Sequence, residues 1–211
     1  GERGVCHYSP YFSWREVDIA KPIAAHFDLP VYVENDVNTL TIVEKWFGYG
    51  RDISHFIVVT VGRGIGAGIV MNGQFYRGVL GGAGEFGHIT MLDGDPPISL
   101  EQLASDDAIL HYAQEVIVQG HDNTTLTAVD NLSLEAITQA ADEGYLFAQN
   151  LLADAGRWLG IGISTLINVL NPQLVIISGE GVQAGKWRLS PMNEAIDKHV
   201  FNGLADDLEI V

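Results

Sequence analysis

The chain has 211 residues, of which 47% are hydrophobic, and its formal net charge is −16 because 27 acidic residues outnumber 11 basic ones. This excess of acid excludes a general basic surface for nucleic acid, since such a chain repels phosphate backbones. No apolar run is long enough to span a bilayer, no signal peptide is visible, and the single Cys6 excludes an internal disulfide, so we expect a cytoplasmic protein without a membrane partner.

The first predicted elements are a strand and a helix. Residues 29–34 (LPVYVE) are typical of a short buried strand, and residues 37–47 have helical spacing that ends at Gly48. The apolar face of this helix is expected to hold Leu40, Val43 and Phe47. Asn35 and Asp36 are therefore predicted at the end of a strand and the start of a helix, where α/β folds bind ligands.

The next three predicted elements are strands. They cover residues 54–62, 67–71 and 74–76. Gly62 to Gly66 indicates a tight turn between the first two strands, and Asn72-Gly73 is a type I′ hairpin signal between the second and the third. The segment is therefore predicted to be an antiparallel meander, which differs from the βαβ unit of a dinucleotide-binding fingerprint.

The second half of the chain is predicted to be mostly helical. Three helices are expected, over residues 100–119, from the N-cap Ser133 to Asp142, and over residues 145–170. Gly160 and Gly162 inside the third helix indicate close packing against another element. Asn171-Pro172 ends that helix, and a buried strand over residues 174–178 follows. The fold class predicted from this order is α/β with mixed strand pairing.

Asn35 and Asp36 are the first candidates for chemistry. A carboxylate beside an amide can accept one hydroxyl proton while the amide binds a neighbouring hydroxyl, which is how a sugar is held and how its hydroxyl is activated by general-base catalysis. The alternative is that these residues only cap the helix that follows, a position that both residue types suit.

Glu85 and His88 are the second candidates. They stand three apart in a glycine-rich segment, so both can point into one cleft and bind sugar hydroxyls or a metal. A metal needs three or four ligands, and Asp93 and Asp95 with a single histidine make a poor structural zinc set. The alternative is an ordinary loop histidine whose hydrogen bonds are satisfied.

Glycine-rich turns are the third candidates. Gly62-Arg63-Gly64-Ile65-Gly66 can bind a phosphate through its backbone amides, although strands flank it on both sides and it fits neither a Walker loop nor a dinucleotide loop. The alternative is a hairpin that requires glycine. Gly179-Glu180-Gly181 follows a buried strand and can also face a ligand, but Glu180 would repel a phosphate there.

Four stretches occur in a fixed order: VYVENDVNTLTIVEKWFG, VTVGRGIGAGIVMNGQFYRGVLGGAGEFGHI, LEQLAS and NVLNPQLVIISGEG. Together they resemble the ROK family, which groups sugar-responsive repressors and sugar kinases. The resemblance covers most of the chain and implies the actin-like ATPase (ribonuclease-H-like) fold, mainly its second, sugar-binding lobe. It implies that residues 1–211 form a single sugar- or effector-binding region.

The resemblance also implies which residues bind ligands. The sugar would be held by Asn35, Asp36, Glu85, His88 and Glu101. In the kinases of the family the aspartate is the catalytic base, so that role would fall on Asp36, and Mg-ATP would be the cosubstrate. A nucleotide would lie against the glycines of the two turns, which are Gly62, Gly64, Gly179 and Gly181.

The chain departs from the family pattern at the zinc site. Members of the family usually bind structural zinc through a histidine and three cysteines that follow it, and His88 would be that histidine. Here Pro96-Pro97 leads directly to Ser99, where a cysteine would stand, so no metal is predicted in this chain. LEQLAS resumes in phase with the family pattern, which favours residues missing from this chain over a naturally shortened loop.

Two further departures concern the nucleotide and DNA. The Asp-x-Gly-Gly-Thr phosphate loop of the first lobe and a winged helix-turn-helix are both absent from the sequence, which resembles a second lobe trimmed at both ends. Arg63 stands where the kinases usually place a small hydroxyl residue, and Glu180 replaces a glycine. Both changes resemble the repressors of the family.

Three hypotheses follow from the resemblance. The first is the effector-binding region of a regulator of the N-acetylglucosamine or xylose repressor type, which binds a monosaccharide or sugar phosphate and contacts DNA only through a domain outside this chain. The second is an ATP-dependent sugar kinase, and the third is a non-catalytic dimerisation scaffold. A homodimer or higher homo-oligomer is a further expectation from the family.

Overall fold

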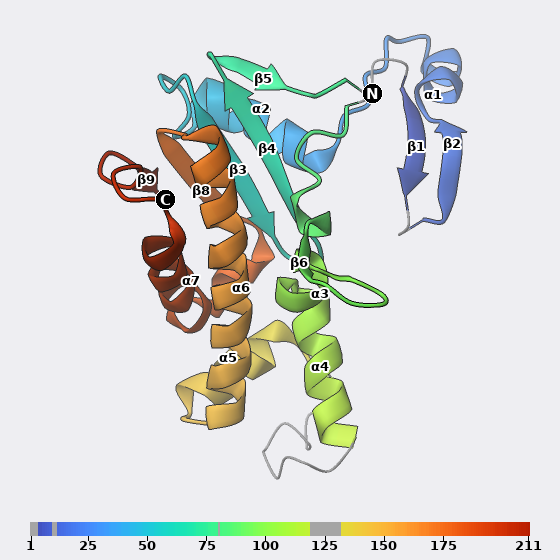
Figure 1. Ribbon diagram of the computed structural model, residues 1–211. Helices are drawn as coiled ribbons and strands as arrows, with labels where there is room; N and C mark the ends of the chain where they lie inside the picture. The colour runs from blue at the N-terminus through green and yellow to red at the C-terminus, as the bar shows by residue number, and fades with distance from the viewer. Residues whose placement is uncertain (1–3, 10–11, 80, 119–131) are drawn as a thin grey trace.

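A five-stranded sheet forms the centre of the molecule. The computed structural model describes residues 4–9, 12–79, 81–118 and 132–211 (Figure 1). The sheet has the order β5-β4-β3-β8-β9, and its strands are β3 (Phe56–Val61), β4 (Ile65–Met71), β5 (Gln74–Tyr76), β8 (Leu174–Ser178) and β9 (Glu209–Ile210). Strands β3, β4 and β5 are antiparallel neighbours, whereas β3, β8 and β9 run parallel. The predicted α/β fold with mixed pairing and the predicted meander are confirmed.

The central strand β3 is apolar on both faces because helices cover both sides of the sheet. Ile57, Val59 and Val61 belong to the main hydrophobic core. Phe56 and Val58 belong to a smaller core on the opposite face. Side chains alternate across a strand, so one continuous apolar run supplies both cores.

Helices of the second half cover the main core. They are α3 (Leu100–Ala104), α4 (Asp106–Val118), α5 (Leu134–Asp142), α6 (Leu146–Leu170) and α7 (Lys186–His199). Ser133 caps α5 as predicted, since its side chain accepts a hydrogen bond from Ala136 N. The long α6 lies along the sheet with α7 beside it (Figure 1). A Cβ at Gly160 would clash with the Met192 carbonyl of α7, and one at Gly162 would lie 2.8 Å from Leu100 Cδ2, which confirms the predicted close packing.

The remaining elements lie around this centre. They are β1 (Val5–Ser9), β2 (Trp14–Asp18), α1 (Ala20–Phe27), the 3-10 turn η1 (Phe86–His88), β6 (Thr90–Leu92), β7 (Ile98–Ser99) and the 3-10 turn η3 (Glu180–Ala184). The β1–β2 hairpin and α1 stand to the right of the sheet in Figure 1. Among the described residues, no helix is both long and apolar enough to cross a membrane.

Helix α2 (Asp36–Phe47) covers the smaller core and begins and ends where predicted, with Gly48 after its last residue. The predicted inward face is correct at Leu40, which packs against the smaller core, but wrong at Val43 and Phe47, which are exposed. Asn38 and Thr41 are buried in their place. The reason is the surface of β4. A Cβ at Gly68 would clash with the Thr41 hydroxyl, so the bare glycine backbone lets a small polar helix face pack directly on the strand.

The predicted strand over residues 29–34 is also wrong. The backbone there has no ladder partner among the described residues, and Tyr32 is 91% exposed. An alternating apolar pattern makes a strand only when a neighbouring backbone accepts its hydrogen bonds, and Pro30 removes one donor from the segment. Asn35 therefore follows an irregular segment rather than a strand.

The single helix predicted over residues 100–119 is two helices, and Gln119 lies outside the described residues. The break is at Ser105, which has an extended conformation (φ −74°, ψ 163°). Its hydroxyl accepts a hydrogen bond from Ala108 N and thereby caps α4. Asp106 N donates to Gly62 O at 2.8 Å, which ties the start of α4 to the β3–β4 hairpin.

A buried ion pair holds this break in place. Arg188 of α7 is fully buried, and its Nη1 lies 2.6 Å from Asp106 Oδ1 and 3.2 Å from Gly181 O. Its Nη2 donates to the Ala104 carbonyl at the end of α3. Burial lowers the pKa of Arg188 below its ordinary value, and the Asp106 carboxylate opposes that shift. One side chain thus joins four segments of the chain.

Removing Asp106 should destabilise the protein strongly, because a buried guanidinium without its partner is costly. We expect Asp106→Ala to lower the free energy of unfolding by about 3–5 kcal/mol in urea denaturation. The neighbouring Asp107→Ala is the matched control, since Asp107 pairs with Arg63 at the surface at 3.5 Å and should cost below about 1 kcal/mol. Equal losses in the two variants would contradict the assigned role of Arg188.

Candidate functional site

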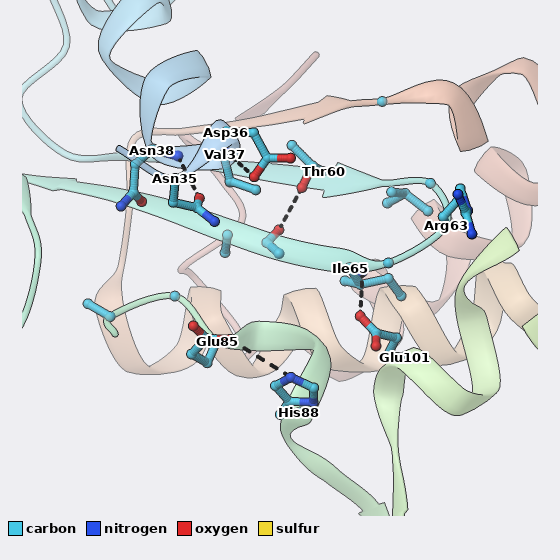
Figure 2. Close-up of a pocket in the computed structure, with 18 of the residues that line it drawn as sticks. Asn35, Asp36, Val37, Asn38, Thr60, Arg63, Ile65, Glu85, His88 and Glu101 are labelled. Atoms are coloured by element: carbon cyan, nitrogen blue, oxygen red, sulfur yellow. Dashed lines mark hydrogen bonds and ion pairs between the residues drawn. The ribbon is translucent and has the colours of Figure 1, made fainter. Parts of the chain in front are cut away.

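One cavity gathers nearly all the candidate residues. It has a volume of about 410 Å³ and lies where the start of α2, the β3–β4 hairpin, the segment before η1, the start of α3 and the start of η3 meet. The residues predicted to bind a sugar all line it, namely Asn35, Asp36, Glu85, His88 and Glu101. Figure 2 shows the first two at the start of α2, on one side of the hairpin, and the other three on the other side.

Asn35 and Asp36 lie at the start of α2 and also face the cavity. Asn35 Oδ1 accepts a hydrogen bond from Asn38 N at 3.1 Å, and Asp36 Oδ1 accepts one from Val37 N at 2.9 Å. The capping alternative is therefore correct for Asn35, whereas Asp36 is the first residue of the helix, and these bonds use one oxygen of each side chain. Within the described part of the chain, Asn35 Nδ2 and Asp36 Oδ2 make no hydrogen bond, so a donor and an acceptor remain for a ligand.

Glu34 joins the start of α2 to Arg77, the residue that follows β5. Its Oε1 accepts hydrogen bonds from Asn38 Nδ2 at 2.9 Å and from Asn35 N at 3.1 Å. Its Oε2 accepts two from the guanidinium of Arg77, at 2.9 and 3.1 Å. Burial raises the pKa of Glu34, but the hydrogen bonds and the charge of Arg77 together lower it by more than burial raises it. The pKa of Glu34 therefore lies below its ordinary value.

Sequence reasoning missed this network. Glu34 and Asn38 are four residues apart across a helix start, a spacing that indicates a contact. The Arg77 partner is 43 residues away, and no local pattern points to it. The Arg77 carbonyl also accepts a hydrogen bond from Ala83 N at 3.1 Å, so the network reaches the glycine-rich segment that leads to Glu85.

Glycine places Glu85 and His88 over the edge of β4. Gly84 has a φ of +90°, and a Cβ there would clash with the Ala67 carbonyl. The backbone of this segment is held to β4 by a 3.0 Å hydrogen bond from Ala67 N to Gly84 O. Glu85 Oε2 and His88 Nε2 are 3.9 Å apart, and both side chains are largely exposed toward solvent. They are thus positioned to hydrogen-bond a ligand rather than each other.

Glu101 enters the cavity from the first turn of α3. Its Oε2 accepts a hydrogen bond from Ile65 N of the β3–β4 hairpin at 2.9 Å (Figure 2). A Cβ at Gly64 would lie 2.9 Å from the same oxygen, and one at Gly87 would lie 3.0 Å from it. The carboxylate therefore sits between the hairpin and η1, and its Oε1 makes no hydrogen bond among the described residues.

The glycines predicted to border a nucleotide divide into two groups. Gly62, Gly64 and Gly179 line the cavity, whereas Gly181 is buried outside it. A Cβ at Gly181 would clash with the buried Arg188 guanidinium, so this glycine has a packing role. The Gly62 amide donates to Gly64 O at 3.0 Å, so this amide is already bonded within the β3–β4 hairpin.

The described residues around His88 do not fit a zinc site. No group of three or more His, Cys, Asp or Glu side chains in the described ranges can hold a metal ion. Ser99, which stands where a cysteine was expected, caps α3 in a capping box with Gln102. The segment before it forms the short β6–β7 hairpin, in which Leu92 pairs with Ile98. No step of the chemistry below uses zinc.

Comparison with known proteins shows which family the chain resembles. The model of the ROK family matches residues 2–211. A putative xylose repressor of Caldicellulosiruptor sp. (strain Rt8B.4) is 34% identical over 206 residues, which cover 94% of this chain and 52% of that protein. The chain therefore spans about half the length of this relative.

Two solved structures share the fold. A ROK family transcriptional regulator, described as a homologue of the E. coli MLC protein, superposes with a TM-score of 0.88 at 29% identity. The match covers 100% of our chain and 54% of the regulator chain. A ROK family glucokinase from Streptomyces griseus, in complex with glucose and AMPPNP, has a TM-score of 0.85 at 27% identity. This match covers 99% of our chain and 71% of the glucokinase chain. The predicted actin-like fold is confirmed.

Replacing Glu34 tests whether its network stabilises the cavity wall. We expect Glu34→Gln to lower the free energy of unfolding by about 1–3 kcal/mol near pH 7, because it removes a charge that accepts four hydrogen bonds. Because the pKa of Glu34 is lower in the folded protein, its charge stabilises the fold fully at pH values above the ordinary glutamate pKa. This stabilisation is lost as the pH falls through the lowered pKa.

Denaturation of both proteins at several pH values measures this effect. The difference between wild type and Glu34→Gln should shrink toward zero as the pH falls through the lowered pKa of Glu34. The exposed Glu194→Gln is the control and should show little difference at any pH. A wild-type advantage that stays constant from neutral to acid pH would contradict the role of the Glu34 charge.

Proposed function

The chain belongs to the ROK family, and we propose that it is the sugar-sensing, effector-binding region of a transcriptional regulator of that family. The observation behind this proposal is the single cavity that combines Asp36, Glu85, His88 and Glu101 with the amide of Asn35. The likeness to a xylose repressor and to the solved ROK regulator supports the regulatory assignment. DNA would be bound by a domain outside this chain.

A monosaccharide suits the groups that the cavity presents. Sugar hydroxyls both donate and accept hydrogen bonds, so they match a mixture of carboxylates, an imidazole and an amide. Asp36 Oδ2 and Glu101 Oε1 accept from hydroxyls, while Asn35 Nδ2 donates to them. The volume of about 410 Å³ lies in the range of small-molecule sites.

Sensing would depend on the two sides of the cavity. Asn35 and Asp36 belong to the α2 layer, whereas Glu101 belongs to the helical layer on the opposite face of the sheet. A sugar that bonds to both layers favours the arrangement in which they are close together. Such a difference in affinity between two arrangements is what allows a ligand to shift a domain equilibrium.

A sugar kinase is the alternative that a specific observation favours. Asp36 Oδ2 has no partner among the described residues and lies in the cavity, as a general base for a sugar hydroxyl requires. The glucokinase likeness supports this reading as well. Release of ADP from the full-length protein with sugar and Mg-ATP, abolished by Asp36→Asn, would establish the kinase and displace the regulator.

The remaining features of the proposal concern the whole protein. We expect it to act in the cytoplasm as a homodimer or higher homo-oligomer, with residues 1–211 forming one effector-binding region. A non-binding dimerisation scaffold is the third possibility. It predicts that substitutions in the cavity leave every function unchanged.

The sugar-binding assignment is tested by removing one carboxylate from each side of the cavity. Asp36→Ala and Glu85→Ala should each weaken sugar binding roughly ten- to a hundredfold, because each removes a hydrogen bond to a charged group worth about 1.5–3 kcal/mol. Calorimetric titration with glucose, xylose and N-acetylglucosamine measures the affinity. The stability should change little, since both side chains are exposed.

Matched control variants come from α7, far from the cavity lining. Asp197→Ala and Glu194→Ala remove exposed carboxylates and should leave the dissociation constant unchanged. An unchanged sugar affinity in both Asp36→Ala and Glu85→Ala would overturn the assigned sites. Absence of binding to every sugar in wild type would overturn the proposed function itself.

A further inference from the structure

The charge of the cavity is strongly one-sided. Among the described residues that line it, four are carboxylates, Asp36, Glu85, Glu101 and Glu180, and one is an arginine, Arg63. Arg63 is paired with Asp107, which belongs to the first turn of α4; the Asp107 carboxylate lies 3.5 Å from Arg63 Nε. The positive charge is therefore opposed by a fifth carboxylate, and the field inside the cavity is negative.

Two backbone amides of the glycine turn are also engaged. A turn of this kind binds anions when its N–H groups point at the ligand. Here the Ile65 amide donates to Glu101 Oε2 at 2.9 Å, and the Gly62 amide donates to Gly64 O at 3.0 Å. Glu101 thus occupies one of the positions that an incoming phosphate would need. An anionic ligand would have to displace this carboxylate and then face the other three.

We infer that the cavity selects an unphosphorylated monosaccharide and rejects its phosphate ester. The inference rests on the proposed sugar-binding function and narrows it to one ligand class. A phosphate monoester carries nearly two negative charges at neutral pH, so every cavity carboxylate opposes it. Uncharged hydroxyls, in contrast, are good partners for the same carboxylates.

Matched pairs of ligands test the selection. The purified chain is titrated in the calorimeter with glucose and glucose 6-phosphate, with xylose and xylose 1-phosphate, and with N-acetylglucosamine and its 6-phosphate. For the sugar that binds, the phosphate ester should bind at least about tenfold more weakly at low salt. Raising the salt concentration should narrow the gap, because the Debye length falls from about 30 Å at 0.01 M to about 8 Å at 0.15 M.

One variant separates repulsion from a simple lack of space. Glu180 is exposed at the start of η3, and its backbone N lies 3.9 Å from the position of a Cβ at Gly62. Glu180→Gln should reduce the difference in affinity between the sugar and its phosphate ester several-fold at low salt. Glu194→Gln on α7 changes the net charge equally and should leave the gap unchanged.

Three results would count against the inference. Equal or tighter binding of a sugar phosphate would overturn it while leaving the sugar-binding function intact. A gap that responds neither to salt nor to Glu180→Gln would also overturn it, because the exclusion would then be steric. Absence of binding to all six ligands would overturn the proposed function and this inference with it.

Discussion

The fold around the cavity depends on one buried ion pair. Arg188 cannot be moved toward water without unpacking α6 from α7, because Gly156 of α6 packs against the Arg188 backbone. From this fixed position the guanidinium donates hydrogen bonds to the end of α3, to the start of α4 and to the Gly181 carbonyl of η3. The Asp106 amide then fixes the hairpin through Gly62 O. Three walls of the cavity therefore share one anchor that is not itself among the residues lining the cavity.

The parts of the fold that follow local rules could be predicted from the sequence. The apolar run of β3, the Asn72-Gly73 turn with two positive φ angles and the amphipathic α6 all express short-range patterns. The break at Ser105 could not be predicted, since an uninterrupted helical pattern is overridden by partners 82 residues away. Likewise, the polar inward face of α2 depends on the glycines of a strand that comes later in the chain.

The cavity residues could be predicted only through the combined order of the motifs. Taken alone, Asn35 suited a helix cap and Glu85 suited a loop, and the structure shows that Asn35 does cap a helix while it faces the cavity. What the sequence could not show is how these residues are supported. The bond from Ile65 to Glu101 spans 36 residues, and the pairing of Glu34 with Arg77 spans 43. Contacts at such separations leave no periodicity to detect.

The features that distinguish a sensor from a kinase lie on one side of the cavity. Both proposed functions use Asp36 and Glu85 to hold a sugar, so the sugar side cannot separate them. A kinase must also admit the phosphates of a nucleotide beside the glycine turn. In this chain Glu101 accepts the Ile65 amide, Asp107 opposes Arg63, and Glu180 adds a charge at the same edge. The positive groups of this turn already face carboxylates of the protein, so the turn favours a neutral ligand over a phosphate. That property suits a sensor better than a phosphoryl-transfer enzyme.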